Sequence, residues 1–165
     1  MGEVRVRTLG EPGDLGWVVQ AHGELYAREY GWDASFEALV SQIVTDFALA
    51  HDERCERGWI AELDGSRVGC VLCVADDDPG TAKLRVLLVH PDARGHGLGA
   101  RLVDTCVTFA RDAGYRRLRL WTNDVLTRAR HIYLAAGFLM VEQKPSCNFG
   151  VELVEQTYEL DLGPA

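Results

Sequence analysis

Residues 90–114, HPDARGHGLGARLVDTCVTFARDAG, place three glycines where an apolar helical pattern begins. These glycines are Gly95, Gly97 and Gly99. A glycine in or beside a helix costs roughly 0.5–1 kcal/mol relative to alanine, so its presence needs a compensating reason. The preceding residues, 82–91, read as a strand that ends at a proline. A helix that starts directly after such a loop exposes backbone N–H groups without helical acceptors, and these form an anion site.

The glycine loop therefore predicts a pyrophosphate cradle, to which Arg94 and Arg101 add positive charge. Two common phosphate-binding patterns are excluded by the residues themselves. The Walker pattern requires Gly-Lys-Ser/Thr, which is absent, and the dinucleotide pattern requires G-x-G-x-x-G, whereas residues 95–99 read G-H-G-L-G. From the glycines alone, a tight turn without a ligand remains the alternative.

Hydrophobic periodicity predicts an α+β fold with a mixed, twisted central sheet of about seven strands and four helices in one domain over residues 1–165. Asp14 is expected to cap the first helix, and Asp33 or Ser35 the second. Strand–helix–strand units favour some parallel pairing, whereas hairpins favour antiparallel pairing. The expected strands are residues 4–9, 57–63, 66–76, 82–91, 115–122, 138–145 and 151–162, and the expected helices are residues 13–32, 33–52, 98–114 and 124–138.

The composition indicates the class of protein and the environment expected for it. With 47% hydrophobic and 25% charged residues, the 165-residue chain is typical of a globular protein in water, without an apolar run long enough to cross a membrane. The five cysteines are odd in number and sparse, so we expect small buried thiols in a reducing cytoplasm rather than a disulfide framework. Cys70 and Cys73 fall in one predicted strand, so their thiols should point to opposite faces.

Charge is distributed unevenly along the chain. Residues 1–64 carry 5 Arg against 13 Asp and Glu, whereas residues 82–130 carry 10 Lys and Arg against 4 Asp. The net charge of −8 makes nucleic acid an unfavourable partner, although the basic middle can hold a small polyanion. The acidic N-terminal segment is either a solvated surface or one that attracts a cationic ligand.

Two motifs resemble those of the GNAT superfamily of N-acetyltransferases. Residues 94–99, RGHGLG, are similar to its R/Q-x-x-G-x-G/A signature, and residues 129–138, ARHIYLAAGF, resemble its A-x-x-x-Y-x-x-x-G-F motif. The preceding LLVHP is similar to the superfamily's fourth strand, and the resemblance covers nearly the whole chain. It implies a GNAT-like fold with acetyl-CoA as the acetyl donor and no metal. More narrowly, LYAREYGWD, LWTNDVL and QTYELDL resemble the acetyltransferase half of fusions with a MarR-type DNA-binding regulator.

The resemblance also implies a cofactor site, residue by residue. Three residues of the fourth strand are implied to run beside the pantetheine arm like an added strand, and the amides of residues 95–100 to hold the pyrophosphate. Asn123 is included because Leu126 stands where the superfamily often has an asparagine that contacts the cofactor. The full set is Leu87, Leu88, Val89, Arg94, Gly95, His96, Gly97, Leu98, Gly99, Ala100, Arg101 and Asn123.

For catalysis, the resemblance implies that Tyr133 lies near the thioester sulfur and protonates the departing thiolate. Periodicity alone would make Tyr133 a core aromatic residue. The general base is harder to assign, because the strand that often carries a glutamate in the superfamily has Lys83 and Arg85 instead. Glu29 is the candidate base, and the alternatives are Asp46, His22, His131 or a chain of water molecules.

The acceptor is expected between the N-terminal helices and the C-terminal strands. Its candidate walls are Tyr26, Tyr30, Trp32, Asn148 and Phe149. The expected function is acetyl transfer to a primary amine of a small molecule or protein, and the acidic N-terminal segment suggests a cationic acceptor. An acyl-CoA-binding sensor with little catalysis is the alternative. Homodimerisation is common in similar proteins, but the sequence does not decide it. No membrane partner is expected.

Overall fold

The computed structural model describes residues 2–164 and contains one seven-stranded sheet in the order β1-β2-β3-β4-β5-β7-β6. All neighbouring strands are antiparallel except β4 and β5, which are parallel. The strands are β1 (Val4–Thr8), β2 (Arg57–Leu63), β3 (Ser66–Ala75), β4 (Thr81–Val89), β5 (Arg117–Asn123), β6 (Leu139–Asn148) and β7 (Val151–Asp161). The helices are α1 (Asp14–Tyr30), α2 (Ala34–Ala50), α3 (Leu98–Asp112) and α4 (Thr127–Ala135), with a short 3-10 turn η1 (Pro91–Ala93). The predicted α+β class with seven strands and four helices is confirmed.

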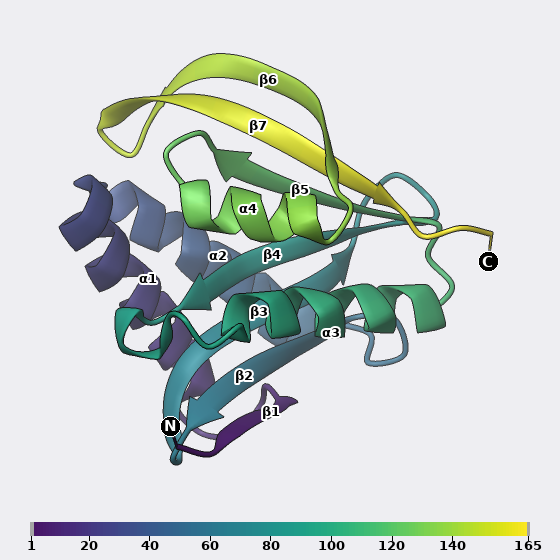
Figure 1. Cartoon of the computed structure of the whole chain (residues 1–165), viewed down its shortest axis with the longest axis horizontal. Coiled ribbons are helices and arrows are strands. Elements are labelled where there is room, and N and C mark those ends of the chain that lie inside the picture. Colours follow the sequence, from purple (N-terminus) through teal and green to yellow (C-terminus); the bar gives the residue numbers. More distant parts are fainter. Residues whose placement is uncertain (1, 165) are drawn as a thin grey trace.

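Helices cover both faces of the sheet, α1 and α2 on one and α3 and α4 on the other (Figure 1). On the α3 face, Leu102 packs with Val71 in the larger apolar cluster. On the α1–α2 face, Val40 packs with Leu72. Successive residues of β3 thus enter different cores, because side chains alternate along a strand. This alternation also places the Cys70 and Cys73 thiols on opposite faces, as predicted.

The parallel strands β4 and β5 separate after a short contact. Only residues 81–83 of β4 pair with residues 117–119 of β5. Further along β4, Val86 has a left-handed backbone with φ of 50°, and the register against β3 shifts between Cys70 and Leu72. This bulge bends β4 away from β5, as bulges do. The second half of β4 therefore presents a backbone edge to the gap between the two strands.

Some predicted boundaries and exposures were wrong. Helix α4 begins at Thr127 rather than 124, because Asp124 is held in a turn where its carboxylate accepts the Val154 N–H at 3.0 Å. Strand β6 extends through Asn148 rather than ending at residue 145, since a proline is tolerated in an edge strand. That extension leaves Cys147 exposed, contrary to the prediction of a buried thiol.

Of the two predicted helix caps, one is present in the structure and the other is not. Asp33 caps α2 as predicted, because its carboxylate accepts the Ser35 N–H at 3.0 Å. Asp14 does not cap α1, whose N-cap residue is Gly13. The Asp14 carboxylate is instead fully buried and accepts from Arg7 at 2.8 and 2.9 Å and from Arg67 at 2.8 Å. The structure thus uses the residue as the centre of a buried ion cluster that joins β1, β3 and α1.

The electrostatics of this cluster favour the charged form of Asp14. Burial by itself would raise the pKa of the carboxyl, but hydrogen bonds from Arg7, from the Gly10 N–H and from Arg67 hold it well below its usual value. A group whose pKa is lowered by folding stabilises the protein above its unfolded pKa, near 4, and loses that contribution as pH falls toward the folded pKa.

We therefore expect Asp14→Asn to lower the free energy of unfolding by about 3–5 kcal/mol at pH 7, because it leaves the buried Arg7 without its main counter-charge. Urea unfolding of the variant and of Asp112→Asn, an exposed control in α3, measures the loss. The difference from the unmodified protein should shrink below pH 4. A loss no larger than that of the control would contradict this role.

Candidate functional site

The glycine loop joins the end of β4 to the start of α3. Gly95 and Gly97 have φ of 86° and 70°, in the left-handed region that favours glycine, and a Cβ added to either meets nothing within 4 Å. Gly99 differs, because a Cβ there would lie 2.5 Å from the Ile132 Cδ1. Two of the glycines thus allow the turn and leave open space above it, and the third lets α4 pack closely against α3.

The start of α3 has the N–H groups and the absence of acidic residues that suit an anion. Its N-cap Gly97 provides no side-chain hydrogen bond, and the first turn contains no acidic residue. The Arg101 N–H donates to the Gly97 carbonyl at 3.0 Å, so the N–H groups of residues 98–100 precede the first helical bond. Such N–H groups together with the helix dipole attract an anion.

A cavity of about 230 Å³ opens onto this loop. It contains most of the residues predicted to hold the cofactor, which come from β4, the loop and α3. The exceptions are His96 and Arg101, which are exposed outside it, and Asn123, which lines a second cavity. The predicted residues that do line it are Leu87, Leu88, Val89, Arg94, Gly95, Gly97, Leu98, Gly99 and Ala100.

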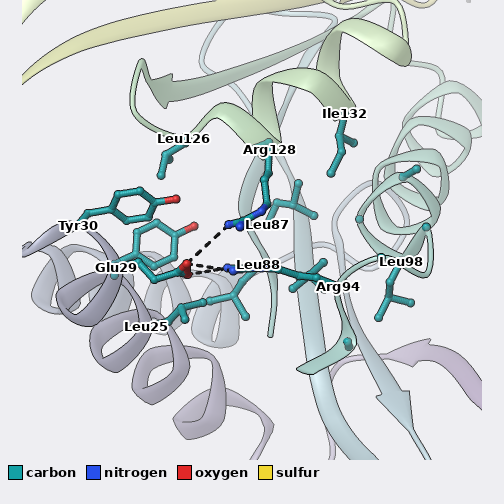
Figure 2. A pocket seen from close by; sticks show the side chains of 18 residues that line it. Leu25, Glu29, Tyr30, Leu87, Leu88, Arg94, Leu98, Leu126, Arg128 and Ile132 are labelled. Carbon is teal, nitrogen blue, oxygen red and sulfur yellow. Dashed lines mark hydrogen bonds and ion pairs between the residues drawn. The ribbon is translucent and has the colours of Figure 1, made fainter. Parts of the chain in front are cut away.

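A cluster of charged side chains spans this cavity, hereafter the smaller cavity, from α1 to the glycine loop (Figure 2). The Glu29 carboxylate accepts from Arg94 at 2.6 and 3.0 Å and lies 3.7 Å from an Arg128 nitrogen. The hydrogen bond from Arg94 lowers the pKa of Glu29, against a smaller opposing effect of burial. A carboxylate with two cationic partners and a lowered pKa is a weak proton acceptor. This geometry therefore gives no support to Glu29 as the general base.

A larger cavity of about 690 Å³ lies between α1 and α2 on one side and β4, β5 and the β6–β7 hairpin on the other. It shares Tyr26, Leu87, Leu126 and Ala129 with the smaller cavity, so the two are neighbours across the gap between β4 and β5. Tyr133 lines the larger cavity and is buried. Burial, followed by the nearby Cys106, raises the pKa of Tyr133 above its usual range, so its hydroxyl keeps its proton at neutral pH.

Aromatic residues close one end of the larger cavity. Phe149, at the hairpin tip, has its ring centroid 4.8 Å from that of Trp32 and 5.0 Å from that of Phe36. The Phe149 carbonyl also accepts the Asp33 N–H at 3.0 Å, which ties the tip to the α1–α2 corner. Of the predicted acceptor residues, Tyr26, Trp32, Asn148 and Phe149 line this cavity, whereas Tyr30 lines the smaller one.

His22 is a buried polar residue at the larger cavity. Its Nδ1 lies 2.7 Å from the Val18 carbonyl, which fixes the proton there and leaves Nε2 as a hydrogen-bond acceptor. Nε2 is buried without a partner among residues 2–164. Burial lowers the pKa of His22 to about 4, despite the opposing hydrogen bond to Val18, so the ring is neutral at pH 7.

The sequence interpretation did not assign several polar residues of this cavity to the acceptor site, namely Lys83, Arg85, Arg119 and Thr122. A signal for two of them was present, because charged residues alternate with apolar ones in 82–86, AKLRV, within an otherwise apolar strand. Within residues 2–164, no group of three or more His, Cys, Asp or Glu residues could hold a metal ion. Over the same range, no helix is long and apolar enough to cross a bilayer.

The known proteins that resemble this chain in sequence include N-acetyltransferases. The chain is 27% identical over 117 residues to the uncharacterized N-acetyltransferase C1271.07c of Schizosaccharomyces pombe, covering 71% of this chain and 72% of that protein. It is 36% identical over 84 residues to human N-acetyltransferase 8B, which covers 48% of this chain and 37% of that protein. The match thus spans well under half the length of the human relative.

Solved structures share the fold at low sequence identity. The protein yncA from Salmonella typhimurium, solved with its cofactor acetyl-CoA, superposes with a TM-score of 0.77 at 17% identity, covering 99% of this chain and 96% of that one. The ribosomal-protein-S18-alanine N-acetyltransferase from Escherichia coli gives a TM-score of 0.72 at 19% identity, with the same coverage of 99% and 96%. Residues 19–138 match the acetyltransferase (GNAT) family, and this is well over half of the sequence. The chain therefore belongs to the acetyltransferase (GNAT) family.

Proposed function

We propose that this chain is an acetyl-CoA-dependent N-acetyltransferase that moves the acetyl group directly to a primary amine. The observation that supports this most is the pair of neighbouring cavities. One is bounded by a glycine loop and a helix N-terminus suited to a pyrophosphate, and the other contains the Tyr133 phenol. Their shared wall marks where the two substrates would meet.

The residues of the smaller cavity fit acetyl-CoA. The open space above Gly95 and Gly97, the N-terminus of α3 and the nearby Arg128 suit the charged pyrophosphate. The separated edge of β4 at Leu87–Val89 offers backbone groups to the amides of a pantetheine arm, like an added strand. When bound, acetyl-CoA supplies a thioester whose carbonyl carbon an amine can attack.

The protein's own groups would act at the larger cavity. Tyr133 is a protonated hydroxyl that can give a proton to a thiolate, and backbone N–H groups near Leu88 can stabilise negative charge on a carbonyl oxygen. The attacking amine must lose a proton. His22 lines this cavity with its Nε2 buried, whereas Glu29 faces the smaller cavity and is already paired with Arg94. Burial makes the His22 ring a weak proton acceptor as well, so the geometry supports neither residue as the general base.

The finer predictions from the sequence stay predictions. They are a cationic acceptor, a homodimer, a cytoplasmic location, the absence of a metal and the likeness to MarR-type fusion proteins. None of the acidic residues in 1–64 lines the larger cavity, so their excess gives no support to a cationic acceptor at this site. Size-exclusion chromatography with light scattering measures the oligomeric state directly.

Gly97→Glu should weaken acetyl-CoA binding by more than tenfold, because it places a carboxylate at the N-terminus of α3, where the pyrophosphate is expected. Isothermal titration with acetyl-CoA measures this, and a thermal melt tests whether the left-handed turn tolerates the new side chain. Gly16→Glu, at an open and exposed position of α1, is the control for the added charge. Equal affinity in both variants would contradict the cradle.

Tyr133→Phe should lower kcat by about 100-fold while acetyl-CoA affinity is kept, because the phenol donates a proton but the ring preserves the packing. Steady-state kinetics with an amine acceptor and titration with acetyl-CoA separate the two effects. Tyr115→Phe, which removes a hydroxyl bonded to the Cys55 carbonyl, is the control. An unchanged kcat would contradict the proton-donor role. Acetyl-CoA binding without turnover in the unmodified protein would instead favour a sensor.

Glu29→Gln should retain most of kcat, since the carboxylate is paired with Arg94 rather than free to accept a proton. Freeing Arg94 and Arg128 should strengthen acetyl-CoA binding by up to about fivefold and make it more sensitive to salt. Titrations at two salt concentrations, with the exposed Glu24→Gln as control, measure this. A loss of kcat near neutral pH with unchanged affinity would restore Glu29 as the general base.

A further inference from the structure

Two cations of the larger cavity have no carboxylate at ion-pair distance within residues 2–164, although the cavity is also lined by Asp76, Glu142, Glu155 and Glu159. Lys83 and Arg85, both on β4, make no hydrogen bond or ion pair within residues 2–164, and both line the cavity. The neighbouring Arg119 on β5 is different, because it lies 2.7 Å from Glu159 and 3.2 Å from Asp76. The sheet thus neutralises one of the three cations in this part of the cavity and leaves two available.

The strand register explains why both cations face the cavity. Arg85 lies opposite Leu72, and Lys83 lies opposite Val74. Leu72 and Val74 both belong to the apolar cluster on the α1–α2 side of the sheet. Residues opposite each other in a ladder project to the same side. The two cationic side chains therefore point into the space between β4 and the N-terminal helices.

Arg85 is a partly buried guanidinium without a contacting anion. Burial lowers its pKa, and the acids that oppose this effect, Asp46 and Asp76, act across space without touching it. Partly burying a charge without a partner is unfavourable, and an anion that entered the cavity would relieve the cost. A ligand anion that pairs with Arg85 would account for this unfavourable burial.

Polar and aromatic residues share the cavity with the two cations. The His22 Nε2, the Thr122 hydroxyl oxygen and the Asn123 Oδ1 are buried without hydrogen-bond partners within residues 2–164. These three atoms are closed off from solvent, whereas the two cations face the cavity and suit an oxyanion. The aromatic wall of Trp32 and Phe149 suits an apolar body. The cavity thus offers a cationic region and an aromatic region to one small molecule.

Resting on the proposed function, we propose that the acetyl acceptor is a small amine that also carries a carboxylate or a similar oxyanion, bound by Arg85 together with Lys83, and an apolar body. Arg85 lies two residues before Leu87, which lines both cavities. An apolar amino acid has this combination of groups.

The test compares L-phenylalanine with phenethylamine, which have the same amine and ring but differ in the carboxylate. Acetylation is measured for the unmodified protein, for Arg85→Gln and for Arg111→Gln, an exposed control with the same change of charge. The unmodified protein should have at least tenfold higher kcat/KM for phenylalanine, mainly through KM. Arg85→Gln should remove this preference, because it lowers kcat/KM for phenylalanine at least tenfold more than for phenethylamine. Lys83→Gln, expected to reduce the preference in part, replaces Arg85→Gln if that variant does not fold.

Binding of 3-phenylpropanoate, an anion without the amine, gives a readout that needs no turnover. Calorimetric titration, with and without CoA, should show binding to the unmodified protein and to Arg111→Gln, and at least tenfold weaker binding to Arg85→Gln. Equal turnover of both amines, equal losses for both in Arg85→Gln, or no carboxylate binding would overturn the proposal. If acetyl-CoA does not bind at all, the proposed function fails, while anion binding without CoA still tests Arg85.

Discussion

The separation of β4 from β5 is the constraint on which the rest of the site depends. The two strands pair only at residues 81–83 and 117–119, and Val86 bends β4 with a φ of 50°. A β-branched residue in the left-handed region is strained, at a cost of order 1–3 kcal/mol. The antiparallel ladder to β3 resumes at Leu88 and holds the bend in place. The gap that results opens both cavities and leaves a backbone edge that an amide-rich ligand can satisfy.

The β6–β7 hairpin closes the far side of this gap by a specific contact. Its turn residues, Phe149 and Gly150, both have positive φ, which is the conformation of a tight hairpin turn that matches strand twist. A Cβ on Gly150 would lie 2.8 Å from the Asp33 carboxylate, so the close approach requires glycine. Asp33 both caps α2 and bonds the hairpin tip, and a single residue thus fixes the corner of the larger cavity.

The sequence allowed the fold and the smaller cavity to be predicted largely because their signals are local. Glycines before a helix require an unusual backbone, and this requirement can be read from adjacent residues. The partners of Asp14 and Glu29 could not be read in this way. Asp14 contacts Arg67, which lies 53 positions later in the sequence, and Glu29 contacts Arg94, which lies 65 positions later. The predicted helix cap Asp14 and the candidate base Glu29 are therefore both ion-pair partners in the structure. Lys83 and Arg85 on β4 were not assigned to the acceptor site, because a charge on a strand usually faces solvent, and only the bend and the covering helices enclose these two side chains.

The arginines of this protein differ in how many carboxylates contact them, and this number depends on where in the fold each arginine lies. Arg7 is buried where the chain must be rigid and is paired with Asp14, Glu62 and Glu11. Arg94 stands at the edge of the smaller cavity with one carboxylate, which an incoming polyanion can compete with. Arg85 lies inside the larger cavity with no contacting anion within residues 2–164. Since a partly buried charge without a contacting carboxylate is unfavourable for folding alone, the place of Arg85 on the wall of the larger cavity supports the proposal that a ligand pairs with it.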